Sequence, residues 1–217
     1  MPRAPIGRET DSDDWIPLRI YLHYLEAMAA ELDEPCLGLR LSCGFQPSDL
    51  GPLGLLFING VTVAEACSRL STFLEVWQQG TEAEWSPGER MCSWSYRIAA
   101  PHLRQAGRQD AFFTLGAMCN WLRLRLGPRW APVAVHFEAP PPRGQQAVRD
   151  FFFAPVLYNQ ATNALLIDRG DALRRTNQMT SFDVLPFIER QLCELMKTCD
   201  LEDDVANPEV STVLKRP

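Results

Sequence analysis

The feature that most constrains the fold is a change in the spacing of apolar residues near position 80. Residues 62–77 carry apolar side chains at helical intervals, behind an N-cap at Thr62. Residues 91–98 alternate instead, with the larger side chains on one face, and a Ser-Pro-Gly-Glu turn joins them to residues 81–85. A one-sided helix followed directly by a one-faced hairpin predicts a helix packed on an antiparallel sheet.

The same two patterns assign the rest of the chain. Further helices are predicted at 15–32, 48–57, 110–126, 145–152 and 182–199, and further strands at 133–137, 156–158 and 164–167. We therefore expect an α+β fold in which helices pack on a small, mostly antiparallel sheet. One domain is expected over residues 15–199, between a flexible N-terminus at 1–14 and an acidic, flexible tail at 200–217.

The charge of the chain argues against direct binding to nucleic acid. Its 21 Lys and Arg against 27 Asp and Glu give a formal net charge of −6, whereas a domain that grips phosphates usually concentrates basic residues on one face. The N-terminus lacks the apolar core of a signal peptide, and the longest apolar runs are too short to span a membrane. We expect a cytoplasmic protein that does not contact a membrane.

Cysteine and histidine do not form a recognisable metal or catalytic site. The seven cysteines are scattered without a CxxC pair, and the three histidines share no spacing. Motifs of hydrolases, metalloproteases, phosphate loops and dinucleotide-binding folds do not occur. We therefore expect reduced thiols, no catalytic residue, no metal and no cofactor, which argues against an enzyme.

Two stretches resemble the N-terminal domain of one branch of the AraC-type transcription regulators. The first is Asp49-Leu50-Gly51-Pro52-Leu53-Gly54 with the helix that follows at 62–74. The second runs through Leu126-Gly127-Pro128-Arg129-Trp130-Ala131-Pro132-Val133, His136-Phe137-Glu138-Ala139-Pro140, Phe151-Phe152, Pro155-Val156 and Asn163-Ala164-Leu165. The resemblance covers residues 35–197 and departs at Phe153, where the family usually has glycine, and at 171–176, where an Arg-Pro-Leu-Pro run is missing.

The resemblance implies a single sensory domain that binds a small metabolite and helps the regulator to dimerise. It also implies that DNA is bound by a separate C-terminal domain with two helix-turn-helix units. Eighteen residues follow Cys199, which is too few for that domain. We therefore expect a truncated regulator, whose tail is the linker toward a DNA-binding half absent from this chain.

The candidate ligand site is aromatic. A sensor pocket is concave and mostly apolar, with a few polar groups that orient the ligand, and Trp and Tyr supply both characters. We expect the pocket between the hairpin face and the helices at 62–77 and 110–126, and its composition favours an apolar or amphipathic effector, such as a fatty acid. The alternative for each residue is ordinary core packing. The candidate ligand-binding residues are Trp77, Trp85, Trp94, Tyr96, Cys119, Trp121, Phe152 and Tyr158.

Two other features carry alternative hypotheses. Arg104 and Arg108 form an Arg-x-x-x-Arg pair that resembles cyclic-dinucleotide motifs, so a cyclic-di-GMP-responsive sensor is one alternative. The apolar stripe of the helix at 182–199 predicts a homodimer interface, although it could also pack on its own domain. If that helix binds related regulators, the chain is instead a stand-alone interaction module that sequesters them.

Overall fold

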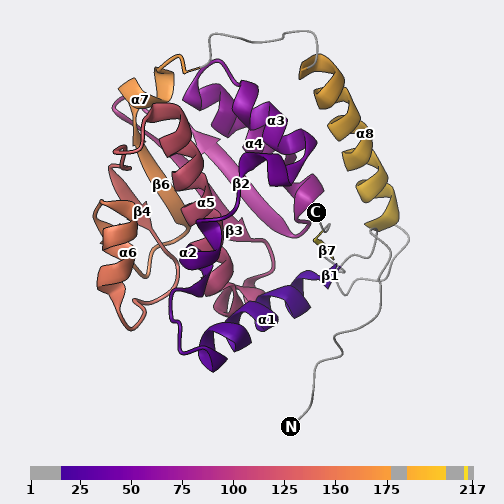
Figure 1. The fold of residues 1–217 in the computed structure, drawn as a ribbon. Helices are drawn as coiled ribbons and strands as arrows, with labels where there is room; N and C mark the ends of the chain where they lie inside the picture. The colour runs from indigo at the N-terminus through magenta and orange to yellow at the C-terminus, as the bar shows by residue number, and fades with distance from the viewer. Residues whose placement is uncertain (1–15, 177–184, 204–212, 215–217) are drawn as a thin grey trace.

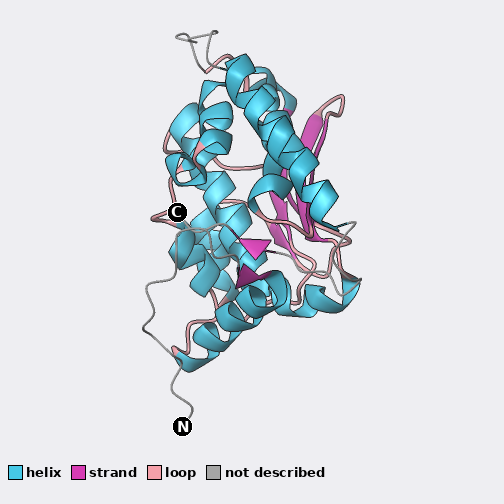
Figure 2. Ribbon diagram, turned by 90° about the vertical axis from the view of Figure 1, so that its right-hand side faces the viewer, coloured by secondary structure: helices cyan, strands magenta, loops and turns pink. Residues whose placement is uncertain are grey.

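A computed structural model describes residues 16–176, 185–203 and 213–214. The flexible ends expected at 1–14 and over most of 200–217 lie outside these residues. In the described part, a layer of helices covers one face of a sheet, as the side view in Figure 2 shows. The expected α+β architecture is confirmed.

Helices make up most of the described chain (Figure 1). The 3-10 helices are η1 (Pro47–Leu50) and η2 (Pro101–Gly107). The α-helices are α1 (Leu18–Glu31), α2 (Leu37–Ser42), α3 (Pro52–Asn59), α4 (Val63–Trp77), α5 (Arg108–Leu126), α6 (Gln145–Phe152), α7 (Arg169–Leu173) and α8 (Leu185–Asp203).

The main sheet has five strands in the order β2-β3-β6-β4-β5. Neighbouring strands of this sheet pair antiparallel, except β4 and β5, which are parallel. A separate two-residue pair joins β1 to β7. The strands are β1 (Ile16–Pro17), β2 (Thr81–Ser86), β3 (Met91–Ile98), β4 (Ala134–His136), β5 (Val156–Leu157), β6 (Asn163–Asp168) and β7 (Val213–Leu214).

Strand β3 shows the predicted alternation directly. Cys92, Trp94, Tyr96 and Ile98 are buried, while the residues between them are exposed or half-buried. The buried face meets the helices and the other face meets solvent, which is the usual arrangement of an antiparallel sheet covered on one side.

Helix α5 is the centre of the helical layer. Side chains on almost every side of it are buried, from Gln109 to Leu122. Helix α2 lies against it so closely that a Cβ on Gly38 would stand 2.0 Å from the carbonyl oxygen of Gln109, and one on Gly116 would stand 2.4 Å from Ser42 Oγ. Glycine at these two positions therefore allows the contact.

Arg125 clamps the far end of α5 to the turn between α3 and α4. Its guanidinium donates hydrogen bonds to the carbonyl oxygens of Phe57, Ile58 and Gly60 and to Thr176 Oγ1. Three of these acceptors come from the C-terminal end of α3, where carbonyl groups have no partner within the helix. The clamp thus joins α5, α3 and the segment that follows α7.

Helix α8 packs on its own domain along one edge. Ile188 and Leu192 are buried in the main core, and Arg69 of α4 pairs with Glu189 at 3.0 Å. In Figure 1, α8 stands beside α3 and α4. Phe187, by contrast, is 62% exposed, so α8 presents apolar surface to solvent as well as to the core.

Several boundaries differ from the sequence predictions. The helix expected at 15–32 begins after Pro17, and the one expected at 48–57 is split by Gly51, whose φ is +56°. Two short helices, α2 and α7, were not predicted, and the last helix runs to Asp203. The strands at 156–158 and 164–167 flank a turn but do not pair, because β4 lies between them in the sheet.

Phe153 occupies the position where the resembling family usually has glycine. It caps the C-terminus of α6 in the left-handed conformation, with φ at +53°. A side chain with a Cβ is strained there, and glycine is not. The ring is 70% exposed and lies 5.4 Å from the Arg123 guanidinium carbon, a cation–π contact.

We predict that Phe153→Gly is more stable than Phe153→Ala by about 0.5–1 kcal/mol. Both variants remove the contact with Arg123, so their difference reports the strain of the left-handed backbone, less the larger conformational entropy that glycine loses on folding. Urea denaturation of the two variants measures it. An alanine variant as stable as the glycine variant would show that the strain does not exceed the entropic cost of glycine.

Candidate ligand site

The eight residues proposed from the sequence all belong to one hydrophobic core. That core runs between the buried face of β3, helix α4 and helix α5, which is the region the sequence indicated. Whether they contact a ligand stays a prediction. The buried members are Trp94, Tyr96, Cys119, Trp121 and Phe152, and the partly buried members are Trp77, Trp85 and Tyr158.

Aromatic rings in this core contact one another directly. Trp94 and Tyr96 stack on β3 with their centroids 6.5 Å apart. The ring centroids of Phe152 and Tyr158 each lie 6.0 Å from that of Phe137. Such contacts are typical of a packed interior, so most of these rings have a structural role whether or not a ligand is bound.

Two polar atoms of this core lack a hydrogen-bond partner among the described residues. They are Trp94 Nε1 and the Tyr158 hydroxyl, and both are buried. Unpaired buried donors are uncommon in native proteins and usually meet a water or ligand. Cys119 behaves differently, because burial raises the pKa of its thiol to about 12 and keeps it an inert, neutral core residue.

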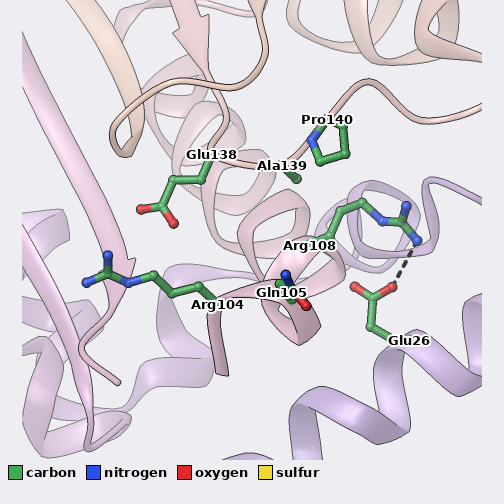
Figure 3. Close-up of a pocket in the computed structure, with 7 residues that line it drawn as sticks. All are labelled: Glu26, Arg104, Gln105, Arg108, Glu138, Ala139 and Pro140. Carbon is green, nitrogen blue, oxygen red and sulfur yellow. Dashed lines mark hydrogen bonds and ion pairs between the residues drawn. The ribbon is translucent and has the colours of Figure 1, made fainter. Parts of the chain in front are cut away.

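A cleft of about 450 Å³ opens beside the aromatic core. Its walls come from α1, from the η2–α5 junction and from the segment after β4 (Figure 3). Charged and polar side chains dominate these walls, unlike the apolar pocket expected from the sequence. The lining residues are Glu26, Arg104, Gln105, Arg108, Glu138, Ala139 and Pro140.

On one wall of the cleft, Glu26 of α1 binds the start of α5. One carboxylate oxygen pairs with Arg108 Nη2 at 2.9 Å, and the other accepts the backbone N–H of Gln109 at 2.8 Å. A carboxylate at a helix N-terminus satisfies a free N–H group and interacts favourably with the helix dipole. The contact therefore holds α1 against α5.

On the other side, Arg104 and Glu138 extend toward the same space (Figure 3). Arg104 is held by one hydrogen bond from its Nε to the carbonyl oxygen of Ile98 at 2.9 Å. Glu138 is fixed through its backbone, whose N–H donates to Asn163 Oδ1 at 3.0 Å. Asn163 also donates to the carbonyl oxygen of Tyr96, so this asparagine ties the end of β4 to β3 and β6.

Tyr96 connects the cleft with the aromatic core. A small recess beside the cleft is lined by Tyr96, Ile98, Ala111 and Asn163 as well as by the charged residues. Of the eight proposed residues, Tyr96 lines this recess, and the other seven lie outside the walls of both cavities. Whether a ligand reaches Tyr96 or the other seven residues stays a prediction.

Below Tyr96 lies a buried carboxylate. Asp110, in the first turn of α5, accepts hydrogen bonds from the Tyr96 hydroxyl and from Gln78 Nε2. Burial raises the pKa of Asp110 to about 6, although the hydrogen bonds from Tyr96, Gln78 and Tyr21 lower it. The network joins α1, α4, β3 and α5 next to the cleft.

Glu26, Gln105 and Glu138 were not among the residues proposed from the sequence. They come from segments far apart in the chain, and single charged residues are ordinary on a protein surface. Glu138 had one signal, its place in the family-like run at 136–140. Arg104 and Arg108 were singled out for their spacing, and they do line the same cleft.

The described residues hold no group of three or more His, Cys, Asp or Glu side chains that could bind a metal. None of the helices in that part of the chain is long and apolar enough to cross a bilayer. The cysteines whose state the structure gives are free thiols.

Comparison with known proteins identifies the family to which the chain belongs. Residues 5–176 match the model of the arabinose-binding domain of the AraC transcription regulator, N-terminal. The chain therefore belongs to this family of regulator domains. Comparison with curated proteins gave no match.

A solved structure confirms the fold. The transcriptional regulator CdpR from Pseudomonas aeruginosa superposes with a TM-score of 0.54 at 20% sequence identity, over 68% of this chain. The match covers 48% of the CdpR chain, so this chain spans about half the length of that regulator. At this identity the likeness concerns the fold alone.

Asp110 should make stability depend on pH. Its pKa is about 6 in the folded protein and near 3.8 when exposed, so the folded state keeps the proton to higher pH than the unfolded chain. Its contribution is therefore fully present below pH 4 and is lost as the pH rises through 6. We expect the free energy of unfolding, relative to Asp110→Asn, to fall by about 1–3 kcal/mol over this range.

Urea denaturation of both proteins at pH 4, 5, 6 and 7 measures this difference. Subtracting the variant removes the contribution of every other titrating group. A difference that stays constant from pH 4 to 7 would show that Asp110 titrates as an exposed carboxyl does.

Proposed function

We propose that this chain is the effector-sensing domain of an AraC-type regulator and that the cleft is its effector site. The observation that carries the proposal is the position of the cleft. It is bounded by charged side chains at the N-terminus of α5, and Tyr96 joins it to a buried network in the middle of the domain. Small-molecule sites are usually concave, with a few convergent polar groups. They often lie next to a group whose pKa is perturbed, as Asp110 is here.

Effector binding would act on the contact between α1 and α5. Glu26 and Arg108 hold that contact and also line the cleft, so a ligand that pairs with either one changes how tightly α1 is held. A ligand can shift a conformational equilibrium only by its difference in affinity for the two states. The contact between α1 and α5 gives the ligand such a difference in affinity. In a cytoplasmic regulator, the DNA-binding half would respond to the change.

Helix α8 is the proposed dimer contact. Ile188 and Leu192 are buried in its own domain, so the free apolar surface is the opposite edge, which includes Phe187. A dimer formed through this edge agrees with the interface predicted at residues 182–199. Helix α8 would keep its contacts with the core. If the partner were a related regulator and not a second copy, the same edge would serve the sequestering alternative.

The cyclic-dinucleotide alternative is supported by the placement of Arg104 and Arg108 on one cleft. The charges of the residues that line the cleft argue against this alternative. Glu26 and Glu138 balance the two arginines, and a cyclic dinucleotide brings two phosphates toward both carboxylates. An apolar effector would instead use the aromatic core that begins at Tyr96.

We predict that the purified domain retains a small molecule, because several charged and polar side chains converge on the cleft. Native mass spectrometry measures the extra mass and identifies the ligand after it is released by denaturation. Thermal shift against fractionated extract of the source cells covers a ligand lost during purification. If no mass is retained and no fraction raises the melting temperature, the sensing function is wrong.

We further predict that Phe187→Glu converts a dimer of the domain to monomer while leaving its fold intact. The phenylalanine is exposed, so a charge there disrupts an interface but not the core. Light scattering measures the mass, and Tyr24→Glu is the matched control, because Tyr24 is an equally exposed aromatic residue on α1. A mass that the Phe187 variant does not change would exclude this edge as the interface.

A further inference from the structure

The cleft presents two opposite charges that are not paired with each other. Arg104 and Glu138 extend into the same space from η2 and from the segment after β4 (Figure 3). Within the described part of the chain, the ion pairs include one between Arg108 and Glu26 but none between Arg104 and Glu138. Both side chains line the cleft of about 450 Å³, so a molecule bound in the cleft can contact both.

The carboxylate of Glu138 is less well hydrogen-bonded than the guanidinium of Arg104. Its Oε1 is buried and accepts no hydrogen bond from the described residues. A buried carboxylate oxygen without a donor is costly, because it has lost water and gained nothing in exchange. Burial accordingly raises the pKa of Glu138, while Arg104 and Arg97 lower it.

Hydrogen bonds anchor the backbone of Glu138 and the guanidinium of Arg104. Asn163 holds the Glu138 N–H at 3.0 Å and the Tyr96 carbonyl at 3.2 Å. Arg104 is fixed by its own bond to Ile98, which leaves the terminal nitrogens of its guanidinium toward the cleft. Two groups of opposite charge on one cleft define the positions of a donor and an acceptor on the ligand.

We infer that the cleft binds a small amphoteric ligand of the amino acid class, whose amine pairs with Glu138 and whose carboxylate pairs with Arg104. This rests on the proposed sensing function and narrows its ligand. Such a ligand satisfies the orphan oxygen of Glu138 and forms the charge-assisted bonds that a guanidinium makes best with a carboxylate. It also leaves the net charge of the cleft unchanged, whereas a dianion or a lone amine does not.

The side chain of the ligand would extend toward the recess at Tyr96, Ile98 and Ala111. These residues offer apolar surface and one aromatic ring. The recess is narrow, with a volume of about 10 Å³, so it admits a large side chain only if the walls move. Rearrangement of that kind would reach Asp110 through its bond with Tyr96.

The first experiment is a thermal-shift titration of the purified domain with each of the twenty proteinogenic amino acids at 10 mM. For the best one, the matching amine without the carboxylate and the matching acid without the amine are tested beside it. We expect at least one amino acid to raise the melting temperature by about 3 °C or more, and neither analogue to do so. If no amino acid stabilises the domain, or if one analogue does so equally, the inference is overturned.

Variants locate the binding. Glu138→Gln and Arg104→Gln should each lower affinity for that amino acid at least tenfold in calorimetry, because each removes one charge-assisted bond. Glu89→Gln and Arg90→Gln are matched controls in the exposed turn of the hairpin and should bind as the wild type does. Equal loss in all four variants, or in none, would exclude this cleft.

A measurement without ligand tests the orphan carboxylate itself. Glu138→Gln should raise the melting temperature of the free domain by about 2–4 °C, since an amide is less costly to bury than a carboxylate. A variant that is less stable than the wild type would show that Glu138 supports the fold instead of awaiting a ligand.

The outcomes separate the ligand class from the sensing function. Stabilisation by cyclic di-GMP that Arg104→Gln abolishes would overturn the amphoteric ligand and leave a sensor. A retained molecule without an amine, found by native mass spectrometry, would do the same. Only the absence of any retained or stabilising molecule overturns both.

Discussion

The polar start of helix α5 is the constraint on which the rest of the domain depends. Gln109 and Asp110 are buried there, and buried polar groups must find partners. Gln109 exchanges hydrogen bonds with Gly38 and Pro35, while the carboxylate beside it is bonded by β3 and α4. Because these partners come from separate elements, satisfying one helical turn positions α1, α2, α4 and the sheet at once. The cleft lies where they meet.

The sequence predicted the elements whose burial is regular. The one-sided stripe of α4 and the alternation of β3 follow directly from periodic contact with a core, and Thr62 does cap α4 by accepting the Glu65 N–H. Short elements such as α2 are too brief for a period to show. The sheet order depends on a crossover between β5 and β6, which no local pattern encodes. Charged walls such as Glu138 gain their meaning only from neighbours distant in the chain.

The family-like motifs have roles that the sequence could not specify. Asn163 bridges β3 and the end of β4. Trp130 donates its indole N–H to Asp171, and Arg123 donates to the carbonyl oxygen of Phe151. These residues set the spacing of segments around the core. The family-like motifs therefore build the scaffold around the cleft, and one of them also contributes Glu138 to its wall.

The Arg125 clamp gives α5 a mechanical property. The helix is gripped at the cleft by Glu26 and, roughly 25 Å away at 1.5 Å per residue, by carbonyl groups of α3 and by Thr176. A rod held at both ends and packed along its length moves as one piece. Helix α5 is therefore a stiff link between the wall of the cleft and Thr176, which precedes α8 in the sequence.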